Sequence, residues 1–279
     1  MTMPDRAALR ARVEAMSNIQ TVPQVVARIT ALIDGGMASA NEIAAEVAKD
    51  QVLAAKVLKL VNSGFYGFRQ PITTVSQAMV LLGQDVIKTV VLTASVLEIM
   101  DSMNRVFSGL WAHSLATARA AAGLCDRLGI EKPEEVALAA LLHDLGKVII
   151  AQRFPAEHEA IRKMVRERNC LQVEAEQAVL GVGHPEVGQW LLKKWALPDA
   201  LVHPIAYHGA FQPQRDFADR TAVVHVADVI ARALGVGNPG DNRVPAIDRQ
   251  AWQLLRIDLR DVEDVCLRLQ ADVDDGLFA

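Results

Sequence analysis

Apolar residues recur along most of the chain at intervals of three and four, which is the spacing of one face of an α-helix. In residues 51–63 they form one stripe, and lysines occupy the opposite side. We find no segment with the alternation of apolar and polar residues that is typical of a β-strand. The pattern therefore predicts an all-α fold. In the first hundred residues we expect helices over 22–34, 41–50, 51–63, 73–83 and 84–100.

The composition turns polar around residues 101–109, between two long apolar stretches. We take this segment as the boundary between an N-terminal helical lobe, residues 1–100, and a C-terminal helical lobe, residues 101–279. In the second lobe we expect further helices over 111–129, 132–152, 156–169, 174–182, 184–197 and 219–235.

Helix-start signals support several of these assignments. Ser39 and Glu42 have the spacing of a capping box, in which each side chain bonds the other residue's backbone N–H. Pro133 and Pro185 each suit the first turn of a helix, where the missing N–H of proline costs nothing.

The composition fits closely packed helices, since 51% of residues are hydrophobic but only 5% are aromatic. The net charge of −4 argues against nucleic acid or an anionic membrane as a partner. Cys125, Cys170 and Cys266 form no CxxC pair and predict free thiols in a reducing compartment. No stretch approaches the roughly 18 uninterrupted apolar residues of a membrane span, and the start has no signal-peptide core. We therefore expect a cytoplasmic protein.

The stretch "LLHDLGK", residues 141–147, places an imidazole, a carboxylate and an ammonium close together. On a helix, residues three and four apart share a face, so His143, Asp144 and Lys147 reach one local site. Gly146 carries no side chain, and a ligand or another helix can therefore approach closely. An isolated His-Asp pair is more often an ordinary surface pair, and the rest of the chain has to decide between these interpretations.

Other predicted helices of the second lobe each offer one suitable group. These are His113, His184, His208 and Asp228. Imidazoles and carboxylates together suit divalent ions such as Fe, Mn, Zn, Co or Ni. Two such ions side by side can stabilise both the attacking and the leaving oxygen of a phosphate ester.

The order H … HD … H … H … D resembles the HD superfamily of metal-dependent phosphohydrolases. The string "HDLGK" is similar to the HDxGK motif of its HD-GYP phosphodiesterase branch. The N-terminal half is more specific, because "DQVLAAKVLKLVNSGFYGFRQPITTVSQAMVLLGQDVIKTVVL" resembles the signature of HDOD domains, the HD-related output domains of bacterial signalling proteins. "LWAHSLATA" and "VVHVADVIARALG" fit the same family. The resemblance covers residues 19–234 and implies a two-lobed helical fold with an HD-like C-terminal lobe.

The resemblance also implies a set of site residues. By motif position, the ligands of one or two divalent ions, expected to be Fe, Mn, Ni or Zn, are His113, His143, Asp144, His184, His208 and Asp228. Lys147 matches a lysine that contacts the substrate phosphate in the HD-GYP branch, which together with Asp144 gives the catalytic candidates.

The sequence departs from the HD-GYP pattern at three points. Tyr207 stands where that branch has the first histidine of a His-His pair, the G-Y-P loop is replaced by "HGAFQPQRDF", and Gly109 stands where some trinuclear sites have glutamate. The resemblance therefore implies a mononuclear or dinuclear site rather than a trinuclear one, and it argues against hydrolysis of cyclic di-GMP.

Two functions follow from the resemblance. In the first, the protein is a regulatory output module of bacterial signal transduction that binds other signalling proteins, with a structural or ligand-sensing metal site. The alternative is a metal-dependent phosphohydrolase or phosphodiesterase acting on a nucleotide or another phosphoester. In that alternative one ion is held by His113, His143, Asp144 and Asp228. His184 and His208 help to hold a second ion or bind phosphate, and Lys147 neutralises the charge of the phosphate.

Other histidines are expected outside the ligand set. His225 lies three residues before Asp228 on the same helical face and is either a partner of a ligand or a core residue. His203 is either a fallback ligand or, as we favour, a loop residue. His158 is expected on the solvated side of a charged helix.

Overall fold

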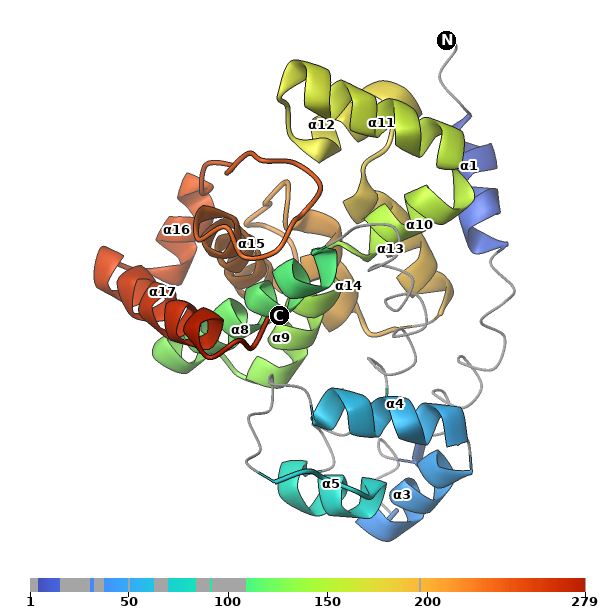
Figure 1. Cartoon of the computed structure of the whole chain (residues 1–279), viewed down its shortest axis with the longest axis vertical. Helices are drawn as coiled ribbons and strands as arrows, with labels where there is room; N and C mark the ends of the chain where they lie inside the picture. The colour runs from blue at the N-terminus through green and yellow to red at the C-terminus, as the bar shows by residue number, and fades with distance from the viewer. Residues whose placement is uncertain are drawn as a thin grey trace. The chain divides into compact units, whose positions relative to one another are not determined.

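The computed structural model describes residues 5–15, 31–32, 38–49, 51–62, 70–83, 91, 109–195 and 197–278. Within these residues the secondary structure consists of α-helices, without any β-strand (Figure 1). The prediction of an all-α fold is therefore confirmed. The helices predicted over 22–34 and 84–100 and the lobe boundary lie largely or wholly outside the described residues, so these remain predictions.

The described helices belong to two compact units. The smaller unit contains α3 (Ala40–Ala48), α4 (Gln51–Val61) and α5 (Val75–Leu82). The larger unit contains α1 (Arg6–Glu14), α8 (Leu110–Leu128), α9 (Pro133–Leu142), α10 (Leu145–Arg153), α11 (Pro155–Arg168), α12 (Gln172–Leu180), α13 (His184–Lys194), α14 (Asp199–Tyr207), α15 (Ala218–Ala233), α16 (Arg249–Leu255) and α17 (Leu259–Asp274).

The smaller unit is held by local signals that are visible in the sequence. Ser39 and Glu42 form the predicted capping box at the start of α3. The side chain of Asn62, just after α4, donates to the carbonyl of Ile72 over 2.7 Å and accepts from the Ile72 N–H over 2.7 Å. Asn62 therefore fastens the end of α4 to the segment that leads into α5.

The core of the larger unit forms where α8 packs against α9 and α15. The side chains of α8 at this contact are small, because Ala116, Ala118, Ala120 and Ala121 are all fully buried. Small side chains let helix backbones approach closely, so polar groups on the three helices can meet in the interior. This contact brings together His113, His143 and Asp228, three of the side chains predicted as ligands.

Residues 132–152 do not form the single helix that we expected. Helix α9 ends at Leu142 and α10 begins at Leu145, because the backbone of Asp144 leaves the helical conformation, with φ −95° and ψ 6°. Adjacent side chains on an unbroken helix diverge by about 100°. The break lets the imidazole of His143 and the carboxylate of Asp144 converge instead.

The first helix packs on the larger unit although it precedes the smaller unit in the chain. Helix α1 contacts α13 and α10. The guanidinium of Arg12 lies over the ring of Phe154 and donates to the carbonyl of Arg153 over 2.6 Å. Arg6 pairs with Glu186. Our domain prediction had grouped α1 with the N-terminal lobe, whereas it belongs to the unit that carries the predicted ligands.

Among the described residues, no helix combines the length and the apolar character that crossing a membrane requires.

Candidate metal centre

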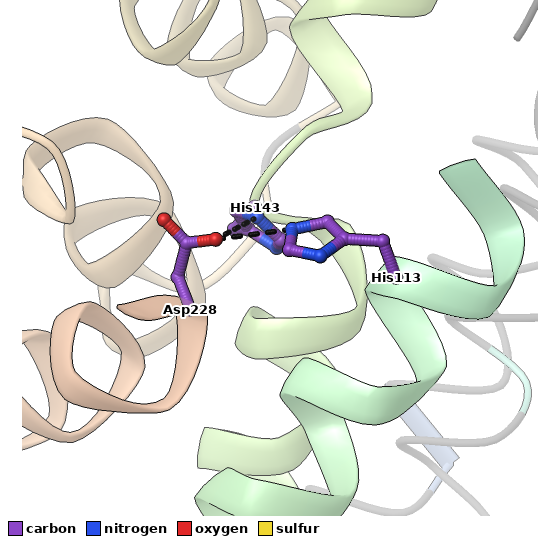
Figure 2. Close-up of side chains that lie close together, drawn as sticks. All are labelled: His113, His143 and Asp228. Atoms are coloured by element: carbon purple, nitrogen blue, oxygen red, sulfur yellow. Dashed lines mark ion pairs between the residues drawn. The ribbon is translucent and has the colours of Figure 1, made fainter. Parts of the chain in front are cut away.

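Two imidazoles and two carboxylates from three parts of the larger unit meet in its interior. His113 projects from α8, His143 and Asp144 from the break between α9 and α10, and Asp228 from α15. Figure 2 shows His113 and His143 both directed at the same oxygen of Asp228. The Nε2 atoms of His113 and His143 lie 3.0 and 3.6 Å from that oxygen, Oδ1. The same nitrogen atoms lie 3.7 and 3.3 Å from Oδ2 of Asp144.

The second oxygen of Asp144 faces another histidine. Its Oδ1 atom lies 3.2 Å from Nε2 of His184, at the first residue of α13. His208, directly after α14, forms a further group with His143 and Asp144, in which one ligand atom from each residue lies within 4.8 Å of the others. The ring centroids of His208 and His184 are 5.6 Å apart. The carboxylate of Asp144 thus lies among four imidazoles, and the other five predicted ligand residues gather around it.

In several of these rings the nitrogen that points away from Asp144, Nδ1, already has a hydrogen-bond partner. Nδ1 of His143 lies 2.6 Å from the Ala140 carbonyl, and Nδ1 of His208 lies 2.9 Å from the Ile205 carbonyl. A carbonyl only accepts hydrogen bonds, so Nδ1 carries the proton in both rings and a neutral ring leaves its Nε2 lone pair free. Nδ1 of His184 meets a carboxylate oxygen of Glu176 at 2.7 Å, the arrangement that commonly orients metal-binding histidines.

The inner atoms fit a divalent cation. Nε2 of His113, His143 and His184 and Oδ1 of Asp144 are buried and have no hydrogen-bond partner of good geometry among the described residues. Ligand atoms about 2.0–2.2 Å from a common ion lie roughly 2.8–3.6 Å from one another, from octahedral to tetrahedral angles. The distances of 3.0, 3.2, 3.3 and 3.6 Å given above fall in this interval, and that of 3.7 Å lies just outside it. A bound cation would give a partner to these inner atoms, which are costly to bury without one.

The electrostatics of the site favour positive charge. Burial raises the pKa of Asp144, but His143 and Lys147 outweigh it and hold that pKa well below its usual range. Burial likewise opposes ionisation of Asp228, yet Arg232 and the nearby histidines keep its pKa well below the usual range. Burial lowers the pKa of His143, but Asp144 and Asp228 outweigh it and raise the pKa to about 9. Both carboxylates are therefore ionised, and the site attracts a cation.

Lys147 is more deeply buried than we expect of a residue that contacts a substrate. Its side chain is 0% exposed, and its ammonium donates to Oδ2 of Asp144 over 2.7 Å and to the carbonyl of Pro239 over 2.8 Å. The structure therefore places the ammonium against a ligand carboxylate. Contact between Lys147 and a phosphate, which the resemblance implied, remains untested.

A cavity of about 690 Å³ opens beside the centre. Three of the predicted ligand residues line it, namely His184, His208 and Asp228, together with Arg232 and apolar residues such as Phe211 and Ile247. The other three lie deeper, since His113, His143 and Asp144 are fully buried. The cavity therefore reaches the centre from the side of α13, α14 and α15.

Three charged residues outside the predicted set hold the centre in place. Glu176 is fully buried on α12, and its carboxylate also accepts the backbone N–H of His184 over 2.7 Å. Arg232 donates to both oxygens of Asp228, over 2.9 and 3.1 Å, and pairs with Asp241 at 3.2 Å. Arg232 follows Asp228 by four residues, a spacing that sequence analysis could have used. Glu176 and Asp241 have no such signal, because their partners are distant in the sequence.

The remaining histidines lie outside the ligand set. His225 bonds the His208 carbonyl through Nδ1, at 2.8 Å, and accepts the Asp248 N–H at Nε2, over 2.9 Å, so both ring nitrogens are occupied. It supports the backbone of a predicted ligand, which is the first of the two roles we considered. His203 lies within α14 rather than in a loop, and His158 is buried rather than solvated. Both expectations were wrong: α14 continues through Pro204, and α11 packs with the His158 side chain buried.

The model of one protein family matches residues 19–211, and that family is described as the HDOD domain. This chain belongs to the HDOD family. The resemblance found in the sequence is therefore confirmed for most of the chain.

Solved structures share the HDOD fold of this chain. An HDOD domain protein of unknown function from Geobacter sulfurreducens is 27% identical, with a TM-score of 0.73 over 91% of this chain and 89% of that one. A candidate phosphohydrolase from Shewanella amazonensis SB2B is 22% identical, with a TM-score of 0.72 over 98% and 96% of the two chains. A candidate signal transduction protein from Marinobacter aquaeolei VT8 is 19% identical, with a TM-score of 0.72 over 99% of this chain but 67% of that one.

An uncharacterized protein from Treponema pallidum is 24% identical over 196 residues, which is 70% of this chain. The matched part is 38% of the length of that protein. The HDOD unit thus forms only a part of some relatives.

Proposed function

We propose that this HDOD protein is a regulatory module of bacterial signal transduction that binds one or two divalent metal ions and acts on other signalling proteins. The metal centre rests on one observation, the convergence of the buried Nε2 atoms of His113, His143 and His184 on two ionised carboxylates. The mixture of imidazole and carboxylate ligands suits Fe, Mn, Ni or Zn.

The ligand assignment follows the two groups of side chains. His113, His143, Asp144 and Asp228 would hold the first ion, since the Nε2 atoms of the two histidines lie 3.0–3.7 Å from the carboxylate oxygens. His184, 3.2 Å from the second oxygen of Asp144, and His208, which has a ligand atom within 4.8 Å of those of His143 and Asp144, would help to hold the other ion. Asp144 would thus contribute to both positions.

Two observations support a regulatory role over a catalytic one. The ammonium of Lys147 is directed at Asp144 and Pro239 rather than at the cavity. In addition, the HDOD unit is only a part of its relative from Treponema pallidum, which fits use as a module. The three cysteines are free, which fits a location in the reducing cytoplasm.

The second candidate function, a phosphohydrolase acting on a nucleotide or another phosphoester, has the adjoining cavity in its favour. A volume of about 690 Å³ suits an organic ligand. A divalent ion at this centre would supply Lewis acidity towards a phosphoryl oxygen. His184 and His208 would orient the phosphate at the inner end of the cavity, and Phe211 and Ile247 would contact the organic part of the ester.

Turnover and partner binding by the metal-loaded protein distinguish the two functions. We expect no metal-dependent hydrolysis above background over a panel of phosphate monoesters, diesters and nucleotides. We also expect cross-linking in bacterial cells to capture signalling proteins on the wild type. Robust hydrolysis that His208→Ala abolishes, together with the absence of any partner, would establish the enzyme instead.

A further inference from the structure

A single loop is fastened to both carboxylates of the candidate metal centre. We define this loop as residues 236–248, between α15 and α16. The buried ammonium of Lys147 bridges Oδ2 of Asp144, at 2.7 Å, and the loop carbonyl of Pro239, at 2.8 Å. One cation thus joins a predicted metal ligand to the loop backbone.

Arg232 makes the corresponding connection to the other carboxylate. Its Nε atom donates to Asp228 over 2.9 Å, and its Nη1 atom donates to the loop carboxylate of Asp241 over 3.2 Å. The side chains of Arg232 and Asp241 are only 8% and 1% exposed, so little solvent screens this pair. Both loop connections are therefore buried and directional.

The same loop also touches the histidine side of the centre. Asp241 accepts the backbone N–H of Gln172 over 2.9 Å, and the Gln172 amide donates to Glu176, the carboxylate that orients His184. At the other end of the loop, a Cβ on Gly237 would lie 2.3 Å from the backbone nitrogen of His113. The loop is thus packed directly on the backbone that carries a predicted ligand.

Opening of the loop changes the electrostatics of the centre. Removing Asp241 and the Pro239 carbonyl takes a negative charge and a carbonyl dipole away from Arg232 and Lys147. The positive charges of Arg232 and Lys147 are then less well compensated. Because both groups lie next to the ligand carboxylates, they disfavour the binding of a divalent ion. By thermodynamic linkage, if opening of the loop weakens metal binding by some factor, then bound metal disfavours opening of the loop by the same factor. Metal binding should therefore hold the loop closed.

We propose that Lys147 and Arg232 are positioning residues that couple occupancy of the metal centre to closure of the 236–248 loop. This inference rests on the proposed metal centre and adds a structural consequence of metal binding, the closure of the loop. The C-terminal end of the loop, Pro245, Ala246, Ile247 and Asp248, lines the cavity beside the centre. Occupancy thereby changes the accessibility of a surface to which a ligand or another protein can bind.

Hydrogen–deuterium exchange of the full chain tests the coupling, with metal content measured on the same samples. The protein is compared after chelator treatment and after saturation with Mn²⁺ or Zn²⁺. We expect amides of the 236–248 loop to exchange on the order of tenfold more slowly in the loaded protein. Those of α17, which packs on α8 but contributes no side chain to the candidate centre, serve as the internal reference. Asp241→Asn should abolish most of this slowing and weaken metal binding about five- to tenfold.

Two further variants separate coupling from simple structural support. Arg232→Lys keeps the charge but cannot bridge both carboxylates, so it should also lose the metal-dependent slowing. Asn242→Ala, at an exposed position of the same loop, should retain it. Stoichiometric metal with unchanged loop exchange in the wild type, or a full metal effect in Asp241→Asn, overturns the inference and leaves the metal centre intact. A protein that takes up no metal overturns both the inference and the metal centre. The comparison of loaded and chelator-treated wild type tests the coupling even if a variant does not fold.

Discussion

The Oδ1 atom of Asp144 lies 3.2 Å from Nε2 of His184, and neither atom has a hydrogen-bond partner of good geometry among the described residues. Because the other oxygen of Asp144 faces His113 and His143, this one carboxylate lies between those two imidazoles and that of His184. That relationship makes a centre with two positions the simplest account of the site, and it predicts unequal effects for substitutions on its two sides.

The two positions should be separable by metal analysis. We expect His184→Ala to lose one ion per chain, if two are bound, and to retain the ion held by His113, His143 and Asp228. His113→Ala should weaken the first position instead. Metal content by mass spectrometry of purified protein checks this, with His203→Ala as the control, because His203 bonds the carbonyl of Asp216 outside the centre. Equal metal content in His184→Ala and the control contradicts the second position.

Glu176 should act on the metal through His184. Its carboxylate accepts three hydrogen bonds, from the N–H and Nδ1 of His184 and from the amide of Gln172. Glu176→Gln places an amide NH₂ among these donors, which should cost about 1–3 kcal/mol of unfolding free energy. It should also weaken metal binding at the second position about 10- to 100-fold. Urea denaturation and metal titration measure the two effects, and unchanged affinity would show that Glu176 is only structural.

Gly146 should tolerate no larger residue, because the backbone of His184, a predicted ligand, lies directly against it. A Cβ at this position would lie 1.9 Å from the carbonyl oxygen of His184. Gly146→Ala must therefore push α10 away from α13, which should destabilise the protein by about 3 kcal/mol and reduce metal content. A Cβ on Gly209 would meet no atom within 4 Å, so Gly209→Ala is the matched control and should stay within about 0.5 kcal/mol of the wild type. Similar unfolding midpoints for both variants would contradict the close approach.

The thiols should differ in reactivity. Burial raises the pKa of Cys125 to about 12, whereas Cys170 and Cys266 are partly exposed. At pH 8 only about one Cys125 thiol in ten thousand is ionised, and the thiolate is the reactive form. Alkylation of the native protein followed by mass spectrometry should therefore label Cys170 and Cys266 first, and Cys125 only after unfolding. Labelling of all three at similar rates would be inconsistent with the described core.

The sequence predicts the helices well because their signals are local. The capping box of Ser39 and Glu42 and the position of Pro133 in the first turn both follow from spacing alone, and both are present. The apolar spacing of residues 51–63 likewise predicts α4, in which Leu53, Val57 and Val61 are buried. Gly146, which we expected to permit a close approach, receives the backbone of α13.

The sequence could not predict how distant groups would pair. The interruption at Asp144 depends on the packing of α10 against the start of α13, which no local pattern encodes. The partnership of Glu176 with His184 and that of Asp241 with Arg232 join different elements in three dimensions. The role of Lys147 was assigned from its motif position, whereas its observed contacts are with a ligand carboxylate and a loop carbonyl.

The metal content of the wild-type protein, purified without chelators and compared with Asp144→Ala, tests the central claim most directly. We predict one or two divalent ions per chain in the wild type and a near-complete loss in Asp144→Ala, because one oxygen of Asp144 faces His143 and the other faces His184. A folded wild-type protein that remains free of Fe, Mn, Ni and Zn even after incubation with these ions would contradict the account.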